Sequence, residues 1–261
     1  MKNIIKTIGL FALIGFSFFY TDKVIEVIRE EDEIMINLTS VIDIYKVDSV
    51  NATIVGNTII PGLKGRTINI TKSYNKMKIN GLFNKNLIVY DDVLPNISIE
   101  KYKDKFIVKG NNNKQMISLI FILNNDKYFN QINDILKNKE TVANYFVDYT
   151  YLINNSTMIK EIETHEFYSY GSNGEYTPDN LLFSNNLLSR IRGLDAIYCL
   201  SSDMNKDVLN LCSKNNLSSG SIILLSMNSE TINELSTKID YIRGKGFKIG
   251  TLSTLLSEDL T

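Results

Sequence analysis

The feature that most constrains the fold is an alternation of apolar runs with amphipathic helical patterns along the C-terminal half of the chain. Apolar side chains dominate residues 116–123, 142–147 and 221–225. In residues 129–136 and 232–242, apolar residues instead recur every three or four positions, which is the spacing of one helix face. Strands that alternate with helices of this length form βα units around a parallel sheet or barrel. The sequence therefore predicts an α/β fold for this half.

The preceding region, residues 37–113, has shorter alternating stretches that are separated by turns. Apolar and polar residues alternate in 42–47 and again in 67–70, which is typical of half-buried strands. The tripeptide Ile-Pro-Gly at 60–62 predicts a β-turn, because proline fixes φ at one central position and glycine accepts positive φ at the next. Residues 72–78 are compatible with a short helix. We expect a small β-rich domain here.

The N-terminus has the charge pattern of an export signal. Lys2 and Lys6 precede an uncharged apolar run over residues 8–20, and an acidic stretch follows at 30–33. Positive charge on the short flank keeps that end in the cytoplasm and exports the rest. Because residues 16–20 lack the small-x-small pattern that signal peptidase prefers, we expect an uncleaved anchor rather than a cleaved, secreted form or a buried helix. The chain would then be a single-pass protein of the cell membrane whose bulk is extracytoplasmic.

Charge and cysteine content argue against two further classes of protein. The chain has 28 basic and 29 acidic residues and a formal net charge of −1, which is unsuited to tight nucleic-acid binding through phosphate neutralisation. Its two cysteines, Cys199 and Cys212, and its one histidine are too few for a zinc site of four cysteine and histidine ligands. We expect two buried thiols, although an exported domain also permits a disulfide between them.

Four segments of the C-terminal region occur in the order found in one known family. Residues 117–121 lie where a strand leads into Thr-Phe-Asp-Asp-Gly, 142–147 match an Ala-Thr-Phe-Phe-Val strand, and 164–166 match Gly-His-Glu. Residues 220–225 match the strand that delivers a late histidine. With these motifs the chain resembles the NodB-type polysaccharide deacetylases over residues 114–261, which implies a (β/α) barrel.

The barrel that this resemblance implies is incomplete or distorted. The stretch 194–217 is short, and the family's catalytic loop corresponds to 196–204 without its Arg and Pro. A further family strand, with its Trp and Asp, has no counterpart between 216 and 220. We therefore expect an open barrel or one that lacks a unit.

Three regions follow from these patterns. Residues 1–34 are expected to form the signal-anchor helix, 35–113 the β-rich domain, and 114–261 the degenerate deacetylase-like domain. The segments 56–62 and 73–77 look like the extracytoplasmic domain that precedes such modules in some low-GC Gram-positive proteins.

The chemistry of the family depends on one divalent metal such as zinc. An Asp and two His hold the metal, a second Asp acts as base and a late His as acid, so that a metal-activated water attacks an N-acetyl group. The resemblance carries these roles onto five positions of this chain: Ile122, Leu123, Tyr170, Gly174 and Ser226. Since all three ligands are replaced together with the base and the acid, we expect no catalytic residue, no metal and no other cofactor.

Other side chains near the same edge leave alternatives open. Carboxylates on predicted loops offer relocated metal ligands, although a solvated surface is their commoner place. They are Asp126, Asp148, Glu175 and Asp203. Tyrosines 168, 170 and 176 could stack on sugar rings, or they could pack against the sheet. The candidate ligand cleft consists of Asp126, Tyr168, Tyr170, Asp203 and Ser226.

The sole histidine, His165, occupies the His of Gly-His-Glu, which is not a metal ligand in the family. We expect a turn or helix-end histidine that forms a local hydrogen bond.

Three functions compete on this basis. The leading one is a non-catalytic deacetylase-like module that binds a cell-wall glycan or an envelope protein through the degenerate cleft. The second is a divergent carbohydrate N-deacetylase with relocated metal ligands. The third is an envelope scaffold protein that acts through its β-rich region.

Overall fold

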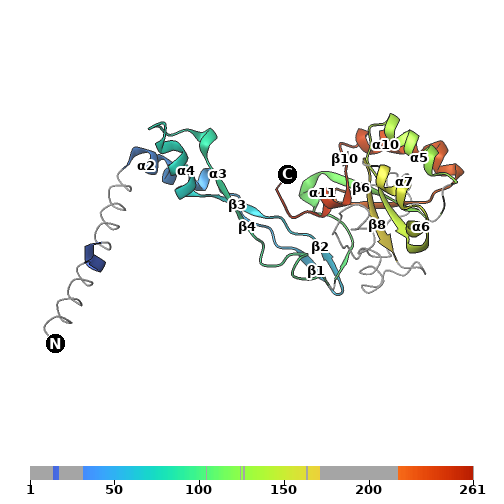
Figure 1. Cartoon of the computed structure of the whole chain (residues 1–261), viewed down its shortest axis with the longest axis horizontal. Coiled ribbons are helices and arrows are strands. Elements are labelled where there is room, and N and C mark those ends of the chain that lie inside the picture. Colours follow the sequence, from blue (N-terminus) through green and yellow to red (C-terminus); the bar gives the residue numbers. More distant parts are fainter. Residues whose placement is uncertain are drawn as a thin grey trace. The chain divides into compact units, whose positions relative to one another are not determined.

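Two compact units make up the chain (Figure 1). The computed structural model describes residues 14–17, 32–103, 105–123, 125, 127–162, 164–170 and 217–260. Unit 1 comprises Met1–Ser49 and Gly65–Leu94, and unit 2 comprises Val50–Lys64 and Pro95–Thr261. Residues 50–64 therefore belong to the same unit as the C-terminal region, although they lie within the predicted β-rich segment.

The predicted anchor lies almost entirely outside the described residues. Within it, residues 14–17 are helical, with Phe16 76% exposed. No helix among the described ranges is both long enough and apolar enough to cross a membrane. The anchor over residues 1–34 stays a prediction.

Unit 1 packs short helices against a two-stranded antiparallel sheet. Its elements are α2 (Glu33–Ser40), α3 (Ile42–Tyr45), β3 (Gly65–Ile68), α4 (Ile70–Lys78), η1 (Lys85–Leu87) and β4 (Tyr90–Val93). Asp32 Oδ1 accepts the Ile34 N–H at 2.8 Å at the start of α2, and Asn69 Oδ1 accepts the Lys72 N–H at 2.8 Å at the start of α4. These caps satisfy amides that a helix leaves unpaired. The unit has its own core of Ile34, Leu38, Ile68, Tyr74 and Met77.

One strand prediction in unit 1 was wrong and one helix prediction is confirmed. Residues 42–45 form the helical turn α3 instead of a strand. Ile42 and Tyr45, three positions apart, both pack against the core of unit 1. This is a helical spacing, which over so few residues was mistaken for the period of two of a strand. The helix expected at 72–78 is α4.

Unit 2 begins with a small sheet of β1 (Thr53–Val55), β2 (Thr58–Ile60) and β5 (Phe106–Ile107). β1 and β2 form an antiparallel hairpin that turns at Gly56, whose φ of +58° suits glycine. β5 adds to β2 in parallel. The β-turn predicted at residues 60–62 was wrong, because residues 61 and 62 form no turn and Gly62 does not have a positive φ. Glycine is needed there for close approach, since a Cβ would be 2.3 Å from the Val50 carbonyl oxygen.

The expected parallel sheet is present in unit 2 and confirms the α/β fold class. Its described strands are β6 (Met116–Leu123), β7 (Asn144–Asp148), β8 (Glu166–Tyr170), β9 (Ile222–Leu225) and β10 (Lys248–Ile249). Its described helices are α5 (Phe129–Asn138), α6 (Tyr149–Asn154), α7 (Ser156–Glu161), α10 (Ser229–Gly244) and α11 (Leu252–Leu256). Ile120 pairs with both Asn144 and Leu224, so β7 and β9 flank β6 on opposite edges, with β8 beyond β7.

Successive side chains of β6 enter two different cores, because a strand alternates faces at every residue. Leu119, Phe121 and Leu123 lie in an outer core with residues of α5 and α10. Ile120 and Ile122 lie in an inner core with residues of β2 and α11. The near-continuous apolar sequence of β6 thus reflects a strand buried on both faces.

Buried polar side chains gather at the N-terminal edge of the sheet, on its inner side. Asn144 is fully buried; its Nδ2 donates to the Leu119 carbonyl at 2.9 Å, and its Oδ1 accepts the Leu252 N–H at 2.7 Å. Ser118 Oγ donates to the Gly250 carbonyl at 2.8 Å. These bonds join β6 and β7 to the start of α11.

The same edge holds a carboxylate and an ammonium group. Glu166 accepts hydrogen bonds from the Ser253 N–H at 3.0 Å, from the Ser253 hydroxyl and from the Tyr168 hydroxyl. Lys114 Nζ donates to the Thr254 carbonyl at 2.7 Å, and burial lowers the pKa of this lysine. The C-terminal segment is therefore bound to the sheet through these polar contacts as well as through Leu252, Leu255 and Leu256, which are fully buried in the inner core.

Candidate functional site

The carboxyl ends of parallel strands form the edge at which folds of this kind carry their catalytic side chains. On the inner face near this edge, the strand register places Ile122 beside Phe146 and Phe146 beside Tyr168. All three belong to the inner core, and the Phe146 and Tyr168 rings stack with centroids 5.3 Å apart. The described layer below the C-terminal edge is therefore apolar.

Ile122 and Leu123, the positions at which the resemblance predicts the family's Asp pair, are the last two residues of β6. Ile122 is partly buried in the inner core, and Leu123 is fully buried in the outer core. Neither side chain has an atom that can bind a metal or accept a proton. The described residues at this edge do not fit the zinc ion that the deacetylase fold would use.

Tyr168 is buried and is not displayed to solvent. Its ring is 5% exposed and stacks on Phe146. Its hydroxyl donates to Glu166, which lies two residues earlier and toward the N-terminal edge. The ring therefore packs inside the inner core, and its polar end points away from the C-terminal edge.

Ser226 is the first residue after β9 and is exposed. Its carbonyl oxygen accepts a hydrogen bond from the Thr231 hydroxyl at 2.6 Å. Asn228 then caps α10, with its Oδ1 2.8 Å from the Thr231 backbone nitrogen. The backbone of Ser226 thus takes part in the turn into α10, while its side chain stands at the rim.

Asp148 ends β7 and initiates the next helix. Its Oδ1 accepts the N–H groups of Thr150 at 2.8 Å and Tyr151 at 3.2 Å, at the first turn of α6. A side-chain oxygen in this position caps the helix, because it accepts amides that the first turn leaves unpaired. Asp148 therefore has a structural role, which accounts for a carboxylate that the sequence offered as a relocated ligand.

Of the candidate cleft, the structure describes Tyr168, Ser226 and the backbone of Tyr170. Tyr170 takes the last position of β8, paired with Asp148 of β7. Several predicted residues lie outside the described ranges: Asp126, Gly174, Glu175, Tyr176, Cys199, Asp203 and Cys212. Within the ranges that are described, no three His, Cys, Asp or Glu side chains are close enough together to hold a metal ion.

His165 lies at the opposite edge of the sheet, immediately before the first residue of β8. It is 5% exposed, and its Nδ1 accepts the Ala143 N–H at 3.2 Å. The ring packs edge-to-face on Tyr145, with centroids 5.6 Å apart. The hydrogen bond joins residues 22 positions apart, so it links the segments that lead into β7 and β8. The only imidazole of the chain is thus at the N-terminal edge.

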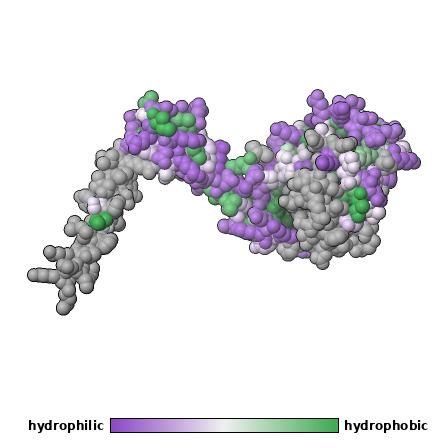
Figure 2. Space-filling view, viewed as in Figure 1, coloured by the Kyte–Doolittle hydropathy of each residue, from purple (hydrophilic) through white to green (hydrophobic). Residues whose placement is uncertain are grey.

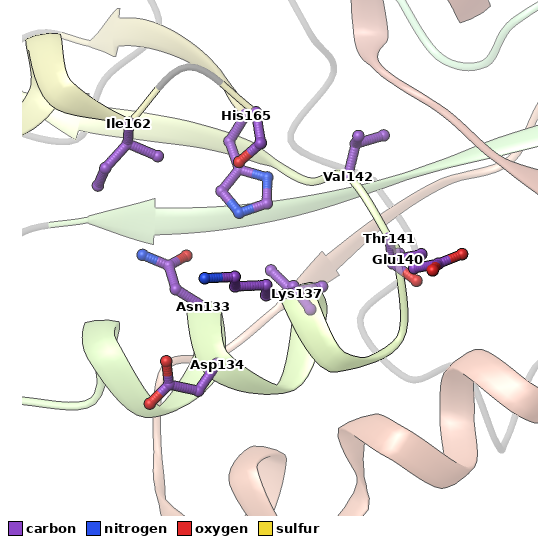
Figure 3. A pocket seen from close by; sticks show the side chains of 10 residues that line it. Asn133, Asp134, Lys137, Glu140, Thr141, Val142, Ile162 and His165 are labelled. Carbon is purple, nitrogen blue, oxygen red and sulfur yellow. The ribbon is translucent and has the colours of Figure 1, made fainter.

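A pocket beside His165 was not predicted from sequence. It lies between α5 and the segments that lead into β7 and β8, and its volume is about 500 Å³ (Figure 3). The lining residues are Asn133, Asp134, Leu136, Lys137, Glu140, Thr141, Val142, Ile162, Thr164 and His165. The sequence signal that could have pointed to it is the placement of the sole histidine just before a strand.

Sequence comparison finds one curated relative. No protein-family profile matches the chain. It is 24% identical over 240 aligned positions to the uncharacterized protein YlxY of Bacillus subtilis (strain 168), and the alignment covers 76% of this chain and 75% of that protein.

Comparison of structures identifies the fold. A mutant of BA3943, described as a CE4 family pseudoenzyme, is 20% identical with a TM-score of 0.61, and the match covers 88% of this chain and 100% of that chain. Wild-type BA3943 from Bacillus anthracis, described in the same way, is 19% identical with a TM-score of 0.60, over 88% of this chain and 97% of that one. The chain thus has the fold of CE4 (NodB-type) structures. The match covers 88% of this chain, which is a larger share of its residues than unit 2 contains. The structural similarity therefore extends into unit 1.

Proposed function

We propose that this chain is a deacetylase-like pseudoenzyme, anchored to the outer side of the cell membrane, that binds cell-wall glycan or an envelope protein at its C-terminal edge. The observation that carries the loss of catalysis is the place of His165. The family's site needs two metal-binding histidines and a third as acid, at the carboxyl ends of the strands. This chain has one histidine, and it is buried beside Ala143 at the other edge.

The reaction has two requirements that the described edge does not meet. Hydrolysis of an amide at neutral pH needs an activated water, and the leaving amine needs a proton. Ile122 and Leu123 supply neither a metal ligand nor a base, and the Ser226 hydroxyl is a poor acid at neutral pH. A relative with the same fold is itself described as a CE4 family pseudoenzyme, and one mutant of it as having restored enzymatic activity. These descriptions support the proposal that the fold can persist without catalytic activity.

The binding part of the proposal is supported by the fold and by the sequence. Clefts at the carboxyl ends of parallel strands are the usual ligand sites of such folds. Of the candidate cleft, Tyr168 is occupied in core packing, so contacts with a glycan or protein fall to Asp126, Tyr170, Asp203 and Ser226. The anchored location is supported by the charge asymmetry around the apolar run at residues 8–20.

Acetate release tests this function. The purified full chain is incubated with N-acetylated chito-oligosaccharides and with peptidoglycan, in buffers that contain zinc, cobalt or nickel. We expect acetate no higher than in the protein-free blank, together with retention of the chain on insoluble peptidoglycan. Acetate release that is proportional to protein, and that is lost in Asp126→Asn or Asp203→Asn, would instead establish a divergent deacetylase with relocated ligands.

A second candidate function rests on the surface of unit 1. Six of its described apolar side chains are more than half exposed, with Ile79 at 85% and Leu82 at 72%, together with Phe16, Ile36, Ile44 and Leu94. Figure 2 shows apolar residues in green on the surface of this unit. Exposed apolar side chains on a small unit favour contact with a protein partner. If unit 1 carries the role, the double variant Ile79→Lys/Leu82→Lys should fail to complement a gene deletion although unit 2 still folds. Full complementation would remove this candidate.

A further inference from the structure

An exposed apolar turn follows helix α4 in unit 1. Ile79 is 85% exposed and Leu82 is 72% exposed, although hydrogen bonds hold the backbone of the turn. The Asn80 N–H and the Gly81 N–H both donate to the Met77 carbonyl, at 2.9 and 3.1 Å. Gly81 has a φ of +68°, which suits glycine. A defined turn thus presents the side chains of Ile79 and Leu82 to solvent.

The turn is supported from within unit 1 by residues on either side of it. Met77 is fully buried in the core of the unit, and Phe83 packs against that core. Ile79 and Leu82 are not among the residues of this core. The core therefore fixes the turn without using these two side chains. An apolar surface that covers them gains their burial with little reorganisation of the unit.

Three lysines flank the two apolar side chains along the chain. Lys76 and Lys78 are in the last turn of α4, and Lys85 begins η1; all three are exposed. A lysine side chain can lie along apolar surface while its ammonium group reaches polar headgroups. Apolar side chains with neighbouring lysines are typical of protein segments that rest on a phospholipid surface.

Two carboxylates lie near the turn, both at the start of α2. Asp32 and Glu33 line one pocket of unit 1 together with Lys78 and Leu82. Both oxygens of Asp32 accept hydrogen bonds within unit 1. The three lysines outnumber these two carboxylates but not the whole acidic stretch at 30–33. Contact with lipid therefore depends on apolar burial and on pairs of ammonium with phosphate, and not on net charge.

The same pocket brings the turn close to the point where the N-terminal segment enters unit 1. It joins the turn to the first residues of α2, which begins directly after Asp32. The predicted apolar run ends at Tyr20, and the stretch from there to Asp32 spans at most about 40 Å when fully extended. A tether of this reach keeps unit 1 at a high effective concentration beside the bilayer, so a small apolar contact is sufficient.

We propose that the turn at residues 79–85 inserts Ile79 and Leu82 into the outer surface of the phospholipid bilayer, with the three lysines at the lipid phosphates. The inference rests on the membrane anchor of the proposed function and adds a second contact, which holds unit 1 against the bilayer. The same two side chains were considered above for a protein partner. The tether and the lysines favour lipid.

The chain has no tryptophan, so a single introduced tryptophan reports on one place. Full-length Leu82→Trp is reconstituted in vesicles of phosphatidylcholine and phosphatidylglycerol. Its emission should shift to shorter wavelength and should be quenched by lipids that are brominated near the headgroup end of the acyl chain. Leu94→Trp is the control, because Leu94 is 65% exposed and follows β4 at the end that pairs with Gly65, farther from α4. Neither effect is expected there.

Flotation separates failure of the anchor from failure of this contact. The vesicles are floated through a density gradient, and quenching is measured only in the protein that floats. If Leu82→Trp floats but has the emission and quenching of Leu94→Trp, the lipid contact is overturned and the two side chains are left to a protein partner. A chain that does not float overturns the anchor and this contact with it.

Further variants of the Leu82→Trp chain test the apolar and the charged parts of the contact. Ile79→Ser should weaken quenching because less apolar surface enters the bilayer. Lys76→Gln/Lys78→Gln should weaken it because contacts with lipid phosphates are lost. Lys72→Gln, in the first turns of α4 and paired with Asp91 at 3.8 Å, should leave quenching unchanged. Equal quenching in the two lysine variants would overturn the role proposed for the lysines.

Discussion

The two edges of the parallel sheet use polar side chains differently. At the N-terminal edge, Ser118, Asn144 and Glu166 are hydrogen-bonded to the C-terminal segment that follows β10. At the described part of the C-terminal edge, the equivalent inner face carries Ile122 and Phe146. The polar side chains of the first edge tie segments of the chain together, whereas Ile122 and Phe146 at the second edge have no side-chain group that can form a hydrogen bond.

The largest expected effect comes from placing a family residue back into the C-terminal edge. Leu123→Asp should lower the free energy of unfolding of unit 2 by about 4 kcal/mol, because it removes a fully buried side chain and buries a carboxylate in the outer core. Urea denaturation followed by circular dichroism measures this loss. Ser226→His, at an exposed position of the same edge, should stay within about 0.5 kcal/mol of the wild type. If both variants were as stable as the wild type, the C-terminal edge could still accommodate side chains that bind a metal.

Asn144→Ala tests the N-terminal edge and should cost about 3 kcal/mol. The substitution leaves the Leu119 carbonyl and the Leu252 N–H buried without their hydrogen-bond partner, and each unsatisfied group costs about 1–3 kcal/mol. Thermal unfolding of the variant beside Ile122→Val provides the comparison, since the latter should cost only about 1 kcal/mol. A smaller loss for Asn144→Ala than for Ile122→Val would contradict the contrast between the two edges.

Glu166→Ala should destabilise unit 2 by about 2 kcal/mol, because the Ser253 N–H and the Tyr168 hydroxyl lose a charged acceptor. Glu166→Gln keeps one acceptor oxygen and should recover part of the loss. Hydrogen exchange of the Ser253 amide reports the change locally. Unchanged exchange in Glu166→Ala would show that this carboxylate does not hold α11.

The smallest effect is expected at the exposed end of the C-terminal segment. Hydrogen bonds from Lys64 and Ser257 lower the pKa of Asp259, so its contribution is present above the ordinary aspartate pKa and is lost as pH falls through the lowered value. Asp259 is largely exposed, and the pair should contribute less than about 1 kcal/mol at neutral pH. The difference in stability between the wild type and Asp259→Asn should therefore vanish in acid. A difference that persists at low pH would assign it to packing instead.

Much of the α/β region could be predicted from sequence because its signals are local. Strands such as 116–123 are apolar throughout, and helices such as α5 show a clear helical spacing. The short elements of unit 1 gave weaker signals: in residues 42–45 a single helical turn was mistaken for a strand. The grouping of residues 50–64 with unit 2 depends on contacts such as that of Gly62 N–H with Glu258, 196 positions away, which no local pattern reveals.

Some features of the candidate site could also be predicted from sequence, and others could not. The sequence predicts, through its resemblance to the family, that Ile122 and Leu123 stand in place of the Asp pair, and the structure places both at the C-terminal end of β6. The helix-capping role of Asp148 and the burial of Tyr168 are not, because both depend on where neighbouring strands and helices lie. The pocket beside His165 joins residues 133–142 to 162–165 across two elements, so it exists only in the folded unit.

The most direct test of the central claim is metal content. The purified full chain is loaded with zinc, cobalt or nickel, dialysed, and analysed by plasma mass spectrometry. If the fold keeps its sheet but lacks metal ligands at the C-terminal edge, we expect far less than one bound metal per chain for each ion. About one tightly bound metal per chain would contradict the account and would direct the search to ligands among Asp126, Glu175 and Asp203.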